Sequence, residues 1–142
     1  MSWLPALRRY LLVTAAGNLV WEVVQLPLYT LWRTARPVEI AFAVLHCLGG
    51  DMLIALAGLV ASLVLFGRTD WPQQGFRRVA AATWLAGLGY TAWSEHFNTV
   101  IKGAWSYADA MPRLPWLDIG AAPMGQWAVV PLLALASAGR TR

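Results

Sequence analysis

Four long apolar runs constrain the fold of this chain more than any other feature. They extend over about residues 9–32, 38–67, 77–101 and 124–138. The first three reach or exceed the roughly 20 residues that a helix needs to cross a bilayer, and the fourth is shorter. Of the 142 residues, 58% are hydrophobic and only 13% are charged, too few charges for a soluble domain of this length. The sequence predicts an all-α integral membrane protein, a four-helix bundle forming one domain over residues 1–142.

The placement of basic residues predicts the orientation of these helices. Basic residues accumulate on the cytoplasmic side of membrane proteins, so both termini are expected inside and the loop over residues 102–123 outside, in a multi-pass protein of the bacterial inner membrane. The net charge of +4 leaves no basic stripe for nucleic acid. The richer end has Arg8, Arg9, Arg68, Arg77, Arg78, Arg140 and Arg142, and the other has Arg33, Arg36, Lys102 and Arg113 with Glu39, Asp109 and Asp118.

Three acids and both histidines lie inside the predicted spans, in the middle-to-outer half of the bundle. A charge at mid-bilayer costs roughly 2.5–3.5 kcal/mol, so such groups usually mark functional sites. Buried polar groups also hold helices together, at about 0.6 kcal/mol each, but several titratable groups at one depth favour a site. The five are Glu22, His46, Asp51, Glu95 and His96, and Gln126 and Trp127 are expected at the same depth.

Helical spacing places many of these polar residues on shared faces. On the first span, Asn18, Glu22, Gln25 and Tyr29 recur at intervals that form one stripe. Two further stripes combine polar and small residues: Asp51, Ala55, Gly58 and Ser62 on the second span, and Gly87, Thr91, Glu95 and Asn98 on the third. We therefore expect a polar cavity that opens outward; the family resemblance described below implies that it binds a lipophilic small molecule or membrane lipid. Its catalytic candidates are Glu22, Glu95 and His46, and its ligand-binding candidates are Asn18, Gln25, Asp51, His96, Asn98, Gln126 and Trp127.

Three segments resemble a known membrane family. Residues 18–29 (NLVWEVVQLPLY) resemble the glutamate-bearing helix of the emopamil-binding and sigma-two receptor superfamily, the EXPERA fold. Residues 90–96 (YTAWSEH) look like that superfamily's Thr-Glu-His segment, and residues 127–131 (WAVVP) are similar to its last-helix pattern. The order and spacing of the four helices also agree. The chain further looks like a set of uncharacterised small bacterial membrane proteins.

The resemblance implies a membrane cavity for a sterol-like molecule. In the isomerase branch, a carboxylic acid and a histidine move a proton across a double bond while a tryptophan stabilises the carbocation. By position, Glu22 and Glu95 would be the acids and Trp127 the cation-facing ring. Two departures separate the chain from that branch: Asn18 stands where the branch has histidine, and Met124 stands where it has asparagine. His46 offers a replacement base that the family does not place there.

Other functions stay open from sequence alone. His46 and His96 are at similar depth on neighbouring spans, as bis-histidine ligation of haem b requires. Nitrogen and oxygen donors from the five titratable residues suit zinc, manganese or iron, although no His-Glu-x-x-His motif is present. The chain would otherwise be a non-catalytic subunit of a membrane complex, or a homo-oligomer. Its interface would then be the stripe of small residues on the second span, which includes Ala55, Gly58 and Ser62. In each case, the outward loop with Trp105, Tyr107, Met111, Pro112, Pro115 and Trp116 is expected to act as a lid or an interfacial anchor.

Overall fold

The computed structural model describes residues 3–140 and is mostly helical, as predicted. Arg142, which the orientation argument uses, lies outside the described residues. Two short strands, β1 (Arg113–Leu114) and β2 (Ile119–Gly120), pair antiparallel within the long loop. The helices are α1 (Trp3–Gln25), α2 (Leu31–Thr34), α3 (Pro37–Phe66), α4 (Phe76–His96) and α5 (Ala121–Gly139).

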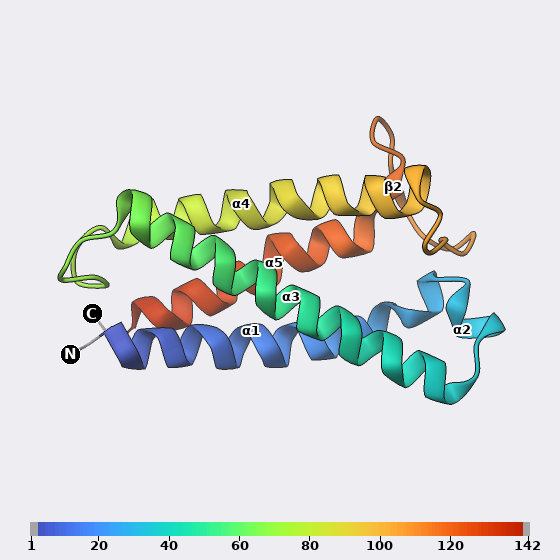
Figure 1. Ribbon diagram of the computed structural model, residues 1–142, viewed down its shortest axis with the longest axis horizontal. Helices are drawn as coiled ribbons and strands as arrows, with labels where there is room; N and C mark the ends of the chain where they lie inside the picture. Colours follow the sequence, from blue (N-terminus) through green and yellow to red (C-terminus); the bar gives the residue numbers. More distant parts are fainter. Residues whose placement is uncertain (1–2, 141–142) are drawn as a thin grey trace.

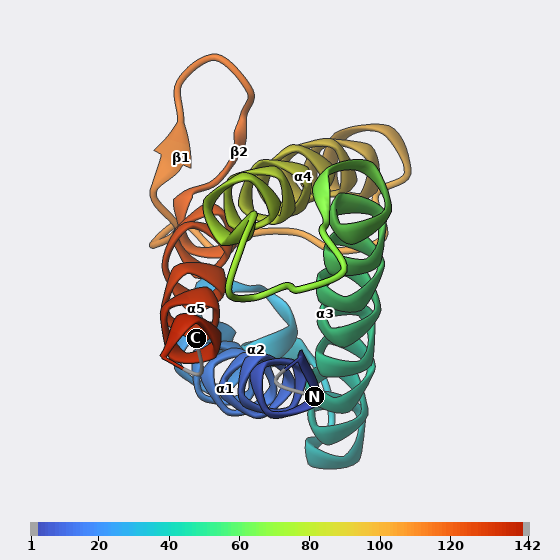
Figure 2. The ribbon, with the colours of Figure 1, turned by 90° about the vertical axis from the view of Figure 1, so that its left-hand side faces the viewer.

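The four long helices lie side by side in a ring. α1 packs against α3 and α5, and α4 packs against the same two helices from the opposite side (Figures 1 and 2). Both chain ends and the α3–α4 connection lie at one end, and α2 and the long loop lie at the other (Figure 1). α3 crosses its neighbours obliquely, so its beginning diverges from α4 while its end lies close to it.

Within residues 3–140, three helical segments are long and apolar enough to cross a membrane: Trp3–Leu28, Pro37–Phe66 and Ala121–Gly139. α4 has the necessary length with 21 residues. It is less apolar because Arg77 and Arg78 lie in its first turn and because two glycines, two threonines and Glu95 lie along it. The prediction of membrane-crossing helices is thus supported for three of the four runs by length and composition.

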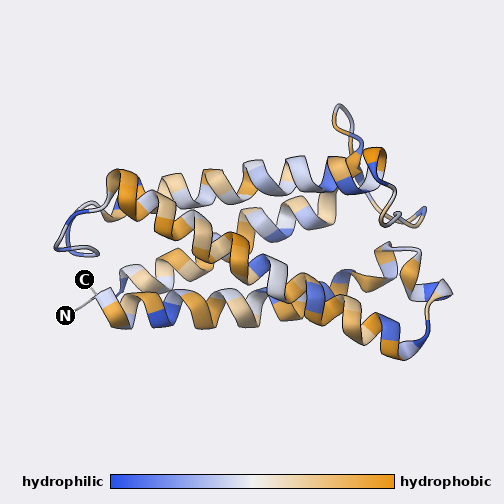
Figure 3. Ribbon diagram, viewed as in Figure 1, coloured by the Kyte–Doolittle hydropathy of each residue, from blue (hydrophilic) through white to orange (hydrophobic). Residues whose placement is uncertain are grey.

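The distribution of polarity is inverted relative to that of a water-soluble protein. Large apolar side chains face outward, including Val24 (73% exposed), Leu53 (71%) and Val64 (78%). Figure 3 shows hydrophobic residues along most of α1 and α3. Among the described residues, ten polar ones are buried between the helices instead: Thr14, Asn18, Glu22, Gln25, Asp51, Ser62, Thr83, Thr91, Glu95 and Gln126. Such an exterior is costly in water and suits hydrocarbon, as expected of an integral membrane protein.

Several helix boundaries differ from those predicted. The first helix starts earlier, at Trp3, and its α-helical part ends at Gln25, because Pro27 lacks the backbone donor that continuation requires. A 3₁₀ turn over Leu26–Leu28 and the short α2 complete the predicted run. The third run changes to a π-helical turn at Phe97–Ile101, and the last helix starts at Ala121 rather than near residue 124.

Small residues allow the helices to pack closely at the end that holds the termini. Ala6, Ala134 and Ala138 are buried there beside the fully buried side chains of Tyr10 and Val79. The Tyr10 hydroxyl donates to the Ala55 carbonyl oxygen at 3.1 Å, joining α1 to α3. The apolar core therefore occupies this half, and the buried acids and amides occupy the other half.

Gly87 of α4 packs directly against the Trp127 ring of α5, which leads to a stability prediction. A Cβ at this position would lie 2.6 Å from two ring carbons of Trp127. Gly87→Ala is expected to destabilise the protein by about 1–3 kcal/mol, as overpacking usually does. Thermal unfolding in detergent measures the effect.

Gly89 is the matched control on the same helix. A Cβ at Gly89 would meet nothing within 4 Å. Gly89→Ala should leave the melting temperature unchanged or raise it, because alanine is the better helix former. An equal loss from both substitutions would contradict the packing described here.

Candidate functional site

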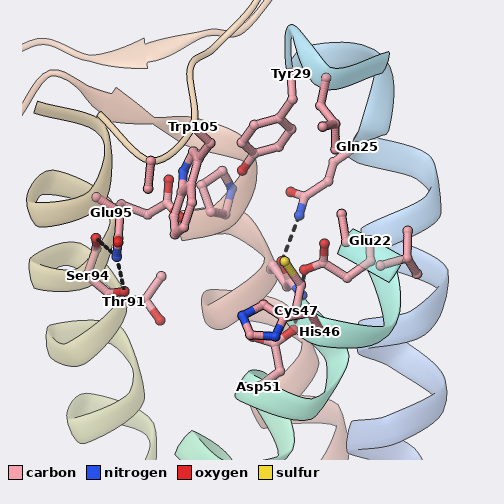
Figure 4. A pocket seen from close by; sticks show the side chains of 18 of the residues that line it. Glu22, Gln25, Tyr29, His46, Cys47, Asp51, Thr91, Ser94, Glu95 and Trp105 are labelled. Carbon is pink, nitrogen blue, oxygen red and sulfur yellow. Dashed lines mark hydrogen bonds between the residues drawn. The ribbon is translucent and has the colours of Figure 1, made fainter. Parts of the chain in front are cut away.

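A pocket of about 750 Å³ lies between α1, α3, α4 and the long loop, with α5 contributing to its lining. This volume is in the range of small-molecule sites in proteins. Figure 4 shows Glu95 on one side of the pocket and Glu22 and Asp51 on the opposite side. The three carboxyl-bearing residues are almost fully buried, at 8–9% exposure. Acids from three different helices thus border one space.

Gln126 lies at the centre of the hydrogen bonds on the α1 side of the pocket. Its amide nitrogen is 2.9 Å from Asp51 Oδ2 and 3.1 Å from Glu22 Oε1. The same nitrogen is 3.1 Å from Asn18 Oδ1, and its own oxygen accepts from Gln25 Nε2 at 3.2 Å. An amide group has two N–H protons, so three acceptors compete for them. One α5 side chain therefore holds α1 and α3 in place beside the pocket.

Trp127 supplies a further donor to this network. Its indole Nε1 donates to Asp51 Oδ1 at 3.3 Å, so consecutive α5 residues bond both oxygens of one carboxyl group. Its ring also lies against Gly87 of α4. Trp127 lines the pocket, and its polar edge is directed to Asp51.

On the opposite wall, Glu95 is joined to the long loop. The Tyr107 hydroxyl donates to Glu95 Oε2, and the Tyr107 ring packs against Tyr29 with centroids 5.5 Å apart. Burial and the hydrogen bond to the Glu95 carboxylate raise the pKa of Tyr107, which therefore keeps its proton and stays a donor at neutral pH. The Arg113 guanidinium lies 5.3 Å from the centre of the same ring.

Backbone hydrogen bonds join residues 106–108 of the loop to residues 28–30 at this end of the bundle. Ala108 N donates to Leu28 O at 2.9 Å, and Thr30 N donates to Ser106 O at 3.1 Å. The hydroxyls of Thr30 and Ser106 lie 2.7 Å apart. Residues 103–106 line the pocket, whereas Trp116 is 93% exposed and lies away from it. Only the first part of the predicted lid therefore borders the pocket.

The two histidines do not face one space. His46 lines the pocket near the surface and stacks on Phe42 at 5.8 Å. His96 is exposed, and its Nδ1 lies 3.3 Å from the Leu117 carbonyl oxygen, outside the pocket. This arrangement gives no geometric support to bis-histidine ligation of haem. Within residues 3–140, no three His, Cys, Asp or Glu residues are grouped so that they could hold a metal ion.

Most of the predicted site residues gather at the pocket. Asn18 lies behind the lining, where it bonds Gln126, and His96 is the one candidate placed elsewhere. Sequence reasoning did not foresee the Tyr107–Glu95 bond, because only the fold of the loop brings these residues together. Cys47 also lines the pocket and gave no signal beyond its place in an apolar run. The predicted residues that line it are Glu22, Gln25, His46, Asp51, Glu95, Asn98, Gln126 and Trp127.

The polar part of the pocket combines three acids with hydroxyl, amide and indole groups. Among the lining side chains that the structure describes, none is lysine or arginine. Gln25 Oε1, Thr91 Oγ1 and Trp105 Nε1 are buried there without a hydrogen-bond partner. Buried polar atoms normally have partners, so the pocket suits a molecule that can donate a hydrogen bond to Gln25 and form hydrogen bonds with Thr91 and Trp105.

Comparison with known proteins found no match: no protein-family model, no curated protein and no solved structure matches the chain. The resemblance of the three segments to the EXPERA superfamily therefore stays a prediction. What is shown is a helical protein in which three helices suit a membrane.

Gln126 provides the second prediction. Gln126→Leu leaves Asn18, Glu22 and Asp51 without their shared donor, which should destabilise the protein by about 1–3 kcal/mol. Gln25→Leu removes a single bond to Gln126 and should cost about 0.6 kcal/mol. Denaturant unfolding in mixed micelles compares the two variants, and equal losses would show that Gln126 has no central role.

Proposed function

We propose that the chain is a polytopic protein of the bacterial inner membrane whose helical bundle binds a lipophilic small molecule. The polar end of that molecule would contact the acids of the pocket. In this proposal all four long helices span the bilayer. α4 packs between α3 and α5, and its 21 residues would extend about 31 Å. Its outward side chains Leu85 (61%) and Trp93 (58%) are apolar and exposed. Thr83, Thr91 and Glu95 are buried between the helices instead, and these residues lower its overall hydropathy together with the arginines of its first turn.

Charge supports an orientation with both termini in the cytoplasm. The end with the termini and the α3–α4 connection has an excess of arginines, and the opposite end is nearly balanced by acids. The positive-inside rule places the richer end in the cytoplasm. The pocket would then lie in the outer half of the bilayer, beneath the loop over residues 102–123.

The three acids in a pocket without a lysine or arginine are the observation that carries the binding proposal. The pocket combines aliphatic and aromatic lining with Glu22, Asp51 and Glu95, and it lies in a bundle whose outer surface is apolar. Its complement is a molecule with a hydrocarbon body and a donor-bearing end, such as a hydroxyl or an amine. A fatty acid anion would meet three acids and would be disfavoured.

Proton transfer to the bound molecule is a second candidate. Glu22 and Glu95 lie on opposite walls of the pocket, so a molecule between them would meet an acid on each side, with His46 at the rim. General acid–base chemistry requires such groups within hydrogen-bond reach of the reacting atoms. Incorporation of solvent deuterium into a bound unsaturated lipophile would support this chemistry, and a ligand that gains no deuterium would argue for binding alone.

A matched series of single-chain probes tests the binding proposal. Dodecanol, dodecylamine and dodecanoate share one hydrocarbon tail, so their differences report the head group. Below their micellar concentrations, the alcohol and the amine should raise the melting temperature, and dodecanoate should not. We expect at least a tenfold difference in affinity, which corresponds to about 1.4 kcal/mol.

Two variants locate the effect within the molecule. Glu22→Gln removes an acid that lines the pocket. This change should reduce the preference for dodecylamine over dodecanoate about tenfold. His96→Gln changes a side chain outside the pocket and should leave the preference intact. Equal binding of all three probes, or an equal response of both variants, would refute binding in this pocket.

A further inference from the structure

Arginines accumulate at the end of the molecule that holds the termini. Six arginines within residues 3–140 lie there, all of them exposed, and Asp70 is the acid that opposes them. Asp70 Oδ1 is 3.6 Å from Arg68 Nε. The opposite end differs, because Arg36 pairs with Glu39 at 2.9 Å and Arg113 with Asp118 at 3.0 Å. The six are Arg8, Arg9, Arg68, Arg77, Arg78 and Arg140.

Four of these residues surround the beginning of α4. Arg77 and Arg78 are in its first turn. The Arg68 side chain lies against the N-cap residue, because a Cβ at Gly75 would be 3.4 Å from Arg68 Cγ. The ring of Phe76, the first residue of α4, packs on Gly139. Arg140 follows Gly139 directly, so its backbone also lies beside the beginning of α4. We call Arg68, Arg77, Arg78 and Arg140 the arginine cluster.

Helix electrostatics makes this cluster an unusual arrangement. The beginning of a helix carries a partial positive charge, so a basic residue there is disfavoured and an anion is favoured. The first turn of α4 contains two arginines and no acid, and the N-cap is a glycine with no side chain to cap it. The free backbone N–H groups at the beginning of α4 and the arginine side chains thus contribute to the same positive electrostatic potential. A bound anion would interact favourably with the N–H groups and with the arginines.

The depth of the cluster identifies the anion. Immediately before Arg68, the exposed side chains are apolar: Val64 (78%), Leu65 (71%) and Phe66 (47%). An arginine next to an apolar surface of this kind lies where lipid phosphates begin. A soluble anion would contact the arginines alone, whereas a phospholipid would contact the arginines with its head and the end of α3 with its acyl chains.

We propose that the arginine cluster binds the head group of an anionic phospholipid in the leaflet on the side of the chain termini. The positive-inside rule requires only an excess of basic residues at this end of the molecule. It does not explain why four arginines lie near the beginning of one helix. The inference depends on membrane insertion and is independent of what the pocket binds.

Native mass spectrometry of the full chain in detergent tests the proposal with defined lipids. The wild-type protein should retain phosphatidylglycerol about tenfold better than phosphatidylcholine, and the difference should shrink as salt is raised. Arg77→Gln with Arg78→Gln should reduce retention of phosphatidylglycerol roughly tenfold. The measurement does not depend on the orientation of the protein in a membrane, which such substitutions can alter.

Arg33→Gln with Lys102→Gln is the matched control. It removes the same number of charges from exposed positions at the opposite end. The control should retain phosphatidylglycerol like the wild type, and both double variants should keep wild-type helicity by circular dichroism. An equal loss from the two double variants would show a response to net charge and would overturn the proposal. Equal retention of the two lipids by the wild type would overturn it as well.

Discussion

The side-chain amide of Gln126 joins three helices, and much of the structure depends on this group. Water cannot hydrogen-bond to polar groups inside a membrane-spanning bundle, so they must find partners within the protein. Gln126 lies within hydrogen-bond distance of side chains on α1 and α3, and Trp127 adds a bond to the same Asp51. This requirement explains why acids and amides that would be unstable in hydrocarbon are concentrated in a single region.

That concentration separates the molecule into two halves of different packing. Near the termini, small residues such as Ala134 and Ala138 let the helices approach closely, and the interior is mainly apolar. Toward the long loop, α3 diverges from α4, and the pocket lies between them. Backbone hydrogen bonds to residues 28–30 and the side chain of Tyr107 attach the loop to this end. The tightly packed half thus joins the helices, and the other half contains the pocket.

Much of this arrangement follows from the sequence, and the remainder depends on tertiary contacts. The predicted stripes are borne out where Asn18, Glu22 and Gln25 are buried on α1, because the helical period alone fixes which residues share a face. The end of α1 was predicted too late because Pro27 changes the backbone path, and no pattern in the loop indicates that Tyr107 reaches Glu95. His96 follows Glu95 directly, yet the helix turns it outward. The orientation in the membrane and the assignment of one domain stay predictions.

The single cysteine of the chain offers the most direct test of the central claim, which is that the pocket receives a lipophilic molecule. Cys47 lines the pocket and is exposed, so its thiol can be alkylated without any engineered change. The measurement is the rate at which N-ethylmaleimide modifies Cys47 in detergent-solubilised protein, with and without dodecanol. We expect dodecanol to slow the reaction and dodecanoate at the same concentration to leave it unchanged. An alkylation rate unaffected by both compounds would contradict the central claim.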